Sequence, residues 1–202
     1  MTTPLITKAD GTKFGKTEGG AVWLDPDMMS PYAFYQFWLN AADDDVVRFL
    51  RIFTFRTREE IAELEAAVRE RPGAREAQRA LAADVTTLVH GAAATEAVIA
   101  ASQALFGRGE LAALDERTLG AAVAELPRTT AAVGDLVVDL FASSGLVASK
   151  AAARRAVAEG GAYVNNTKVA SDDAVLSAAD LLHGRYALLR RGKKTLGVAV
   201  AG

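Results

Sequence analysis

The sequence predicts a mainly α-helical protein that ends in a small α+β module. Apolar residues recur at helical spacing through most of the chain, whereas short runs of strand-forming residues gather near its end. Of the 202 residues, 50% are hydrophobic and 24% are charged, which is typical of a globular chain with one or two domains. We expect an irregular arm over 1–29, a helical domain over 30–106, a connector over 107–132 and the α+β module over 133–202.

The helical domain begins at a clear start signal, because Ser30 can cap a helix whose first position is Pro31. Four aromatic residues follow, too many for one exposed helix, and are expected in the core: Phe34, Tyr35, Phe37 and Trp38. The acidic residues 43–45 offer an N-cap and a favourable dipole interaction to a second helix. Thr57 and Glu60 form a capping box that opens a third helix.

The helical pattern continues over 74–106, and Gly91 marks a break in it. Leu81, Val85 and Leu88 recur at helical spacing, so we expect them to line one face.

The rest of the chain is expected to form short helices first and short strands after them. A short helix is expected near 118–125, a second that ends near Ser144-Gly145, and a third from Ser149 to Glu159. Short strands are expected around a turn at Asn165-Asn166 and around the basic turn 190–194, over 162–164, 167–169, 186–189 and 195–200.

Composition excludes several classes of site. The chain has no Cys, which excludes disulfides and thiolate metal ligands. His90 and His183 are far apart in the sequence, so structural or surface roles are favoured over metal binding. No apolar run reaches transmembrane length and the N-terminus has no signal-peptide pattern, so we expect a cytoplasmic protein without a membrane partner.

Charge is distributed unevenly along the chain. Residues 31–128 hold 11 Lys/Arg and 15 Asp/Glu, whereas residues 133–202 hold 9 and 6. A basic C-terminal module on an acidic chain indicates a local anionic partner. A solvated basic face explains the charge alone equally well.

The segment Lys13-Phe14-Gly15-Lys16-Thr17 carries a pattern suited to a phosphate chain. Its two lysines supply point charges, and the glycine lets backbone N–H groups approach an anion closely. The segment ends like a P-loop, but the first glycine of that motif would fall on Asp10, and the context of strand and helix is missing. The P-loop interpretation is therefore excluded.

The segment resembles the KMSKS signature of class I aminoacyl-tRNA synthetases, in the form found in bacterial tyrosyl-tRNA synthetases. The loop and its flanks 4–7 and 18–25 form one block that is similar to this family, and residues 30–40 form a second. The C-terminal block 144–165 looks like the family's tRNA-binding tail. Three collinear blocks make the resemblance much more specific than the five-residue loop, and it covers essentially the whole chain.

The resemblance implies that the parent enzyme attaches tyrosine to its tRNA through tyrosyl-adenylate, with Mg-bound ATP as a substrate. Lys13 and Lys16 would meet the charge that builds on the departing pyrophosphate, and Thr17 would add a hydroxyl donor. Lys13, Gly15 and Lys16 would contact ATP. Phe14 would pack the loop against the catalytic domain. No bound metal or organic cofactor is expected in this chain.

The resemblance also implies two RNA-binding domains. The helical domain would bind the anticodon, and the last module, of the αL type, would bind the tyrosine tRNA by shape and phosphate contacts. Tyr163 is expected in the core. The residues expected to contact RNA are eight of the nine cations of the last module: Lys150, Arg154, Arg155, Lys168, Arg190, Arg191, Lys193 and Lys194.

The family's catalytic domain, with its tyrosine pocket, has no counterpart in this sequence, and the arm 1–29 would be a remnant of its edge. Met1 falls in the middle of the family pattern, so we expect a truncated form or a misassigned start. The isolated chain is expected to bind tRNA and not to activate tyrosine, and the intact enzyme to be a homodimer. The alternative is a stand-alone RNA-binding protein without ligase chemistry. An in-frame catalytic domain upstream would favour the ligase.

Overall fold

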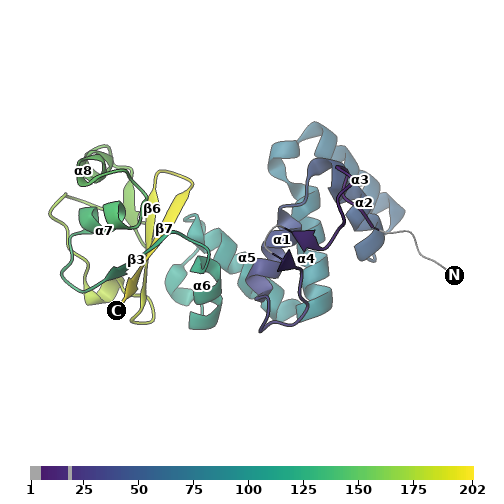
Figure 1. The fold of residues 1–202 in the computed structure, drawn as a ribbon. Helices are drawn as coiled ribbons and strands as arrows, with labels where there is room; N and C mark the ends of the chain where they lie inside the picture. The colour runs from purple at the N-terminus through teal and green to yellow at the C-terminus, as the bar shows by residue number, and fades with distance from the viewer. Residues whose placement is uncertain (1–5, 18–19) are drawn as a thin grey trace. The chain divides into compact units, whose positions relative to one another are not determined.

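The structure is a computed structural model that describes residues 6–17 and 20–202, with the backbone alone described for residues 16, 17 and 20 (Figure 1). The chain divides into two compact units, Met1–Val98 and Ile99–Gly202. The part that the structure describes contains no helix long and apolar enough to span a lipid bilayer.

The first unit consists of helices preceded by a loop and a short hairpin. Helix α4 contacts α1, α2 and α3, so it is the centre of the unit. Its core contains Phe34, Val46, Leu50 and Leu81, all nearly inaccessible to solvent. The elements are β1 (Lys16–Thr17), β2 (Gly20–Ala21), α1 (Pro31–Leu39), α2 (Asp43–Phe53), α3 (Arg58–Glu70), a 3-10 turn (Pro72–Ala74), α4 (Glu76–His90) and α5 (Ala92–Leu105), which runs on into the second unit.

The local signals at Ser30, Thr57 and Gly91 are confirmed. The Ser30 hydroxyl accepts a hydrogen bond from the Ala33 N–H at 3.1 Å, and both halves of the Thr57–Glu60 capping box are formed. Gly91 separates α4 from α5 with a φ of 86°, a conformation that favours glycine.

One expectation for this unit is wrong. The N-cap of α2 is Ala42, which makes no side-chain capping bond, and the acidic residues 43–45 form the first helical turn instead. On the face of α4 that these three residues share, Leu88 is 60% exposed although Leu81 and Val85 are buried. Among the four aromatic residues of α1, Phe37 is only half-buried.

The second unit contains a five-stranded mixed sheet with the order β3-β7-β6-β4-β5. Strand β3 is parallel to β7, and the other neighbours are antiparallel. Helices α7 and α8 lie on one side of the sheet and α6 on the other (Figure 1). The elements are a 3-10 turn (Leu111–Ala113), α6 (Glu116–Val123), β3 (Arg128–Ala131), α7 (Val137–Ser143), α8 (Lys150–Ala158), β4 (Ala162–Val164), β5 (Thr167–Lys168), a 3-10 turn (Ala178–Asp180), β6 (Tyr186–Arg191) and β7 (Thr195–Ala201).

Strand β3 has no counterpart among the expected elements. It lies in the stretch 107–132 that was expected to be a connector, and that stretch belongs to the second unit. Its sequence, Arg128-Thr129-Thr130-Ala131, has no alternation of apolar residues and becomes a strand by pairing with β7. The expected division into four functional segments stays a prediction.

The core of the second unit forms between α7, α8 and the sheet, where Phe141, Val157 and Leu189 pack together. Tyr163 was expected in this core but is half-buried outside it, with the Arg190 guanidinium carbon 4.0 Å from its ring centre. The Asn165-Asn166 turn between β4 and β5 is confirmed. Both asparagines have positive φ, 45° and 65°, as a tight two-residue hairpin turn requires.

Candidate phosphate-binding loop and nucleic-acid interface

The loop over 6–15 is a tight antiparallel turn. The Lys8 N–H donates to the Thr12 carbonyl at 2.8 Å, and the Gly11 N–H donates back to the Lys8 carbonyl at 2.9 Å. The Asp10 carboxylate accepts from the Thr12 N–H at 2.9 Å and from the Thr12 hydroxyl at 2.6 Å. These bonds to the charged form lower the pKa of Asp10, so the carboxylate stays ionised and holds the turn.

Phe14 fastens this loop to the helices of the first unit. Its ring lies among four aromatic rings, with centroid distances of 4.7 Å to Phe49, 5.2 Å to Phe53, 5.3 Å to Trp38 and 5.7 Å to Phe37. The expectation that Phe14 packs against a catalytic domain is therefore wrong in this structure. The sequence showed a crowded aromatic face on α1 but held no sign that Phe14 would join it.

Two polar contacts add to this attachment. The Ala9 N–H donates to Asp45 Oδ1 at 2.7 Å, and Arg48 Nη1 donates to the Thr7 carbonyl at 3.1 Å. Asp45 is 5% exposed, so its carboxylate is part of the fold. Sequence analysis missed this role, since residues far apart along the chain meet only in three dimensions.

The residues expected to contact ATP follow the attached part of the loop. Lys13 is exposed, and Gly15 has a φ of 82° with open space around it. The backbone then pairs β1 with β2. The expected contacts of Lys16 and Thr17 depend on side chains that lie outside the described residues, so those roles stay predictions.

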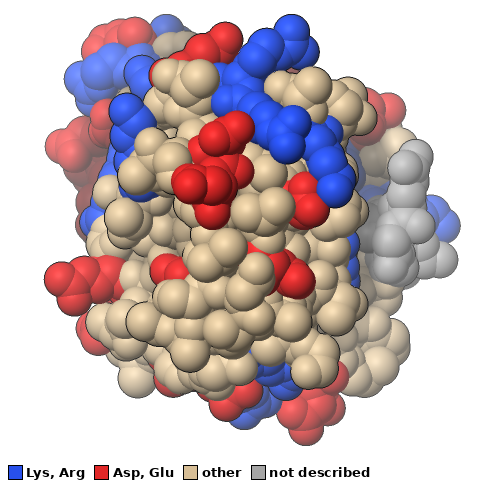
Figure 2. Space-filling view, turned by 90° about the vertical axis from the view of Figure 1, so that its left-hand side faces the viewer, with Lys and Arg blue, Asp and Glu red and all other residues tan. Residues whose placement is uncertain are grey.

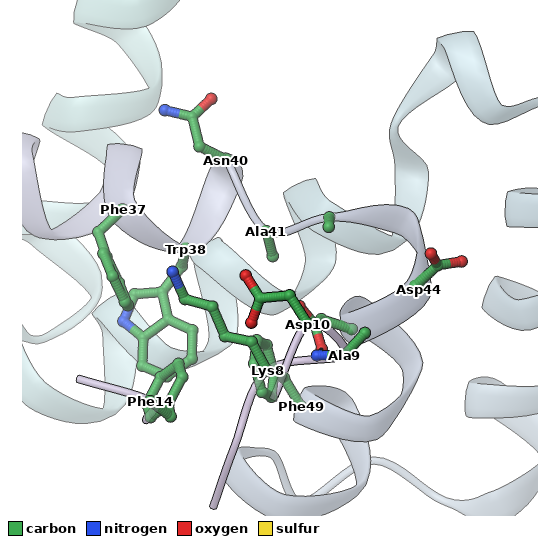
Figure 3. Close-up of a pocket in the computed structure, with 12 residues that line it drawn as sticks. Lys8, Ala9, Asp10, Phe14, Phe37, Trp38, Asn40, Ala41, Asp44 and Phe49 are labelled. Atoms are coloured by element: carbon green, nitrogen blue, oxygen red, sulfur yellow. Dashed lines mark hydrogen bonds between the residues drawn. The ribbon is translucent and has the colours of Figure 1, made fainter. Parts of the chain in front are cut away.

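A pocket of about 510 Å³ lies beside the loop (Figure 3). Figure 3 shows the rings of Phe14, Phe37 and Trp38 grouped on one side of it and the carboxylate of Asp44 on the other. Lys8 lines it as well, a lysine that sequence reasoning passed over. The pocket combines an aromatic wall with charges of both signs.

The second candidate surface belongs to helix α8 and its neighbours in the second unit. Figure 2 looks onto the side of this unit that carries α7 and α8 and shows Lys and Arg side chains in a band, with Asp and Glu beside it. Ser149 is the N-cap of helix α8, and its hydroxyl accepts from the Ala152 N–H at 3.2 Å. This cap starts the helix so that Lys150 and Arg154 share one face and Arg155 lies on the next.

The fold brings four of the expected cations together. Arg154, Arg155 and Lys168 line one open hollow of about 750 Å³. Arg155 and Arg191 line a second hollow of about 200 Å³, which Glu159 lines as well. Arg155 therefore links α8 to strands β5 and β6, which are distant from it in the sequence.

Two of the cations of α8 are paired with carboxylates. Lys150 Nζ lies 2.9 Å from Asp139 Oδ2, and Arg154 Nε lies 3.4 Å from Asp172 Oδ2. Within the described part of the chain, no carboxylate forms an ion pair with Arg155, Lys168 or Arg191. The basic surface therefore contains a paired part and an unpaired part.

Arg190 has contacts within the fold. Besides covering the Tyr163 ring, it donates from Nε to Asn166 Oδ1 at 3.1 Å and from Nη1 to the Gly192 carbonyl at 2.5 Å. Asn166 in turn donates to the Ala104 carbonyl at 2.7 Å. Arg190 thus braces the turn that exposes its neighbours Lys193 and Lys194, and its contact with RNA stays a prediction.

Arginines of the first unit are also occupied by carboxylates. Arg56 makes a two-pronged contact with Asp84 at 2.5 and 3.0 Å, and this hydrogen bonding raises the pKa of Arg56. Arg51 pairs with Glu65 at 3.0 Å.

Over residues 6–17 and 20–202, no group of three or more His, Cys, Asp or Glu side chains is placed to hold a metal ion.

Comparisons with known proteins agree with this two-part organisation. The family model "tRNA synthetases class I (W and Y)" matches residues 1–107, and the model "Tyrosine--tRNA ligase SYY-like C-terminal domain" matches residues 119–198. The tyrosine–tRNA ligase of Streptomyces avermitilis is 68% identical over 99% of this chain and 48% of its own length. That of Streptomyces coelicolor is 68% identical over 96% of this chain and 46% of its own length.

A solved structure adds a further likeness. The C-terminally truncated mitochondrial tyrosyl-tRNA synthetase of Coccidioides posadasii is 42% identical over 48% of this chain and 25% of its own, with a TM-score of 0.42. The chain spans about half the length of the curated relatives that it matches. The chain belongs to the class I tRNA synthetases for tryptophan and tyrosine and, within them, to the tyrosine–tRNA ligases.

Proposed function

We propose that this chain supplies the KMSKS-type loop and the tRNA-binding surfaces of a tyrosine–tRNA ligase. In that reaction the tyrosine carboxylate attacks the α-phosphate of ATP, pyrophosphate leaves, and the tyrosyl group passes from the adenylate to tRNA. The observation that carries the RNA-binding part is the convergence of Arg154, Arg155, Lys168 and Arg191 around two adjoining hollows of the second unit.

The geometry of that surface suits an RNA backbone. Arg155 and Arg191 have no carboxylate partner among the described residues, so both guanidinium groups are available to phosphates. The cations come from a helix and from two strands, which spreads positive charge over an extended face. Such a face favours recognition by shape and phosphate position over reading of bases.

The loop is proposed to serve ATP in the intact enzyme. Phe14 packs into the helical unit while its neighbour Lys13 is exposed, so the anchored ring fixes the backbone from which the Lys13 side chain extends. Lys13 and Lys16 would offset the negative charge that develops on pyrophosphate, Thr17 would donate a hydrogen bond, and Gly15 would allow close approach. The exposed side chains of Trp23, Leu24 and Met28 follow this loop and suit an interface with another folded segment.

The helical unit is proposed to bind the anticodon and the second unit, as an αL-type module, the tRNA body. Phe55 is 92% exposed and shares a hollow of about 440 Å³ with Arg56 and Leu88. An exposed ring of this kind is a platform on which an unpaired base can stack. The intact enzyme is proposed to be a cytoplasmic homodimer with tyrosine, ATP and tRNA as partners.

The RNA-binding part is tested by fluorescence anisotropy with a labelled tyrosine tRNA transcript. Arg155→Ala and Arg191→Ala should each weaken binding about three- to tenfold, and each should reduce the slope of log affinity against log salt by about one. Arg108→Ala is the matched control, because Arg108 is an exposed arginine of the same unit that lines neither hollow. Affinity that is unchanged in both variants would refute the proposed surface.

The catalytic part is tested by tyrosine-dependent exchange between ATP and pyrophosphate. We propose that the chain alone gives no exchange, because the family's tyrosine pocket lies in a part of the relatives that the sequence does not match. Exchange by the purified chain, sensitive to Lys13→Ala, would overturn this proposal. Tight tRNA binding without exchange would agree with it.

A further inference from the structure

Several carboxylates of the second unit bind neutral groups of the fold, whereas those of Asp139, Asp172 and Glu116 pair with cations. Asp135 accepts from the Ala132 N–H at 2.8 Å and Asp180 from the Ser177 N–H at 2.8 Å, so both satisfy the backbone. Asp173 accepts from the Ser171 hydroxyl. Asp139 and Asp172 differ from these, because the partner of each is a cation of α8.

The two ion pairs lie on one face of α8 and are open to solvent. Lys150 and Arg154 are four residues apart, and their partners approach to 2.9 and 3.4 Å. The side chains of Arg154 and Asp172 are each 58% exposed. Exposed pairs of this kind contribute little to folding, so their main effect is on the charge that the surface presents.

We propose that Asp139 and Asp172 are specificity-determining residues of the RNA surface. They neutralise the Lys150–Arg154 row of α8 and confine the positive potential to the row formed by Arg155 and Arg191. This inference rests on the proposed RNA-binding function of the second unit. It adds that the carboxylates beside the cations select between kinds of polyanion.

The selection follows from the different freedom of the two kinds of RNA. A flexible single strand follows any positive surface, because its phosphates can adjust to where the charge lies. A folded RNA presents phosphates at fixed positions, so a cation strengthens its binding only where one of these phosphates reaches that cation. Carboxylates beside a cation repel phosphates that arrive without that geometry, which is how specificity arises through disfavoured alternatives.

The test compares Asp172→Asn with the unchanged chain on two labelled ligands, the tyrosine tRNA transcript and polyuridylate. Loss of the carboxylate frees Arg154, so polyuridylate should bind about two- to fivefold more tightly, the factor that corresponds to an exposed ion pair. Affinity for the transcript should change less than about twofold, so the preference for folded RNA falls. Asp139→Asn should act in the same direction.

Asp173→Asn is the matched control. It removes the same charge at the neighbouring position, but the carboxylate of Asp173 contacts the Ser171 hydroxyl and not a cation of α8. A double-mutant cycle with Arg154→Ala tests the path: Asp172→Asn should have no effect once Arg154 is absent. Arg154 and Asp172 are exposed, so we expect their variants to fold. Thermal unfolding of each variant checks this.

Equal tightening for both RNAs overturns the proposal, as does an equal effect of Asp173→Asn or an additive cycle. The Arg155→Ala variant, measured alongside, reports on the RNA surface itself. If Arg155→Ala weakens transcript binding and Asp172→Asn leaves the preference unchanged, the specificity role alone fails. If the unchanged chain binds neither RNA, the proposed function and this inference fail together.

Discussion

Replacing Phe14 with alanine removes the side chain that holds the phosphate-binding loop to the helical unit. Four aromatic rings surround Phe14 at centroid distances of 4.7–5.7 Å, and truncation leaves a void between them. A fully buried Phe→Ala change costs about 3–5 kcal/mol. Phe14 is half-buried, so about 2 kcal/mol is expected from burial, with up to about 1 kcal/mol more from the lost ring contacts.

The loss should appear as local opening of the loop, because the hydrogen bonds that remain between the loop and α2 are those of Asp45 and Arg48. A change of about 2–3 kcal/mol corresponds to a fall of about 30- to 150-fold in hydrogen-exchange protection. The amides to follow are those of Lys8, Ala9 and Phe14, which are bonded within the loop or to α2.

Phe55→Ala is the matched control for this experiment. It makes the same truncation in the same unit, but Phe55 is 92% exposed and its loss should leave loop protection unchanged. Protection of the Lys8, Ala9 and Phe14 amides that stays at its original level in Phe14→Ala would refute the anchoring role. Equal losses in both variants would refute it as well.

Three further predictions concern stability. Burial lowers the pKa of His90 below its ordinary value of 6.5, so the unfolded chain binds the proton more readily than the folded one. The free energy of unfolding should therefore fall as the pH drops through about 6.5. Urea unfolding at about pH 7.5 and 5.5 measures this fall, which should be smaller in His90→Gln than in the unchanged chain. Thr57→Ala breaks the capping box and should lower the free energy of unfolding by about 1 kcal/mol, so an unchanged urea midpoint would contradict the role of the cap. Arg190→Ala should destabilise the second unit by about 1–2 kcal/mol through loss of its contacts with Tyr163 and the turn, whereas Arg191→Ala should weaken RNA binding and leave thermal unfolding unchanged.

Elements specified by neighbouring residues could be predicted from the sequence. The cap at Ser30, the capping box at Thr57, the break at Gly91 and the turn at Asn165-Asn166 all depend on bonds or dihedral angles within a few residues. Such signals are the same in any tertiary context, which is why they are confirmed.

Elements that depend on a distant partner could not be predicted. Strand β3 has a polar sequence and exists because β7 offers it a parallel edge. Leu88 fits the helical period of α4 yet is exposed, because α4 has packing partners on a limited arc of its surface. Asp45 has the sequence of a helix cap and instead accepts a bond from Ala9 in the loop.

The sequence by itself determined the family, the order of its parts and the residues able to carry charge to a phosphate. The tertiary structure decided which of those residues are free. Arg154 is paired with Asp172 and Arg190 is occupied by Tyr163, while Arg155 and Arg191 meet across two elements without a carboxylate partner among the described residues. The physical reason is that an ion pair depends on the distance between two side chains, and spacing along the chain determines that distance only within one helix or strand.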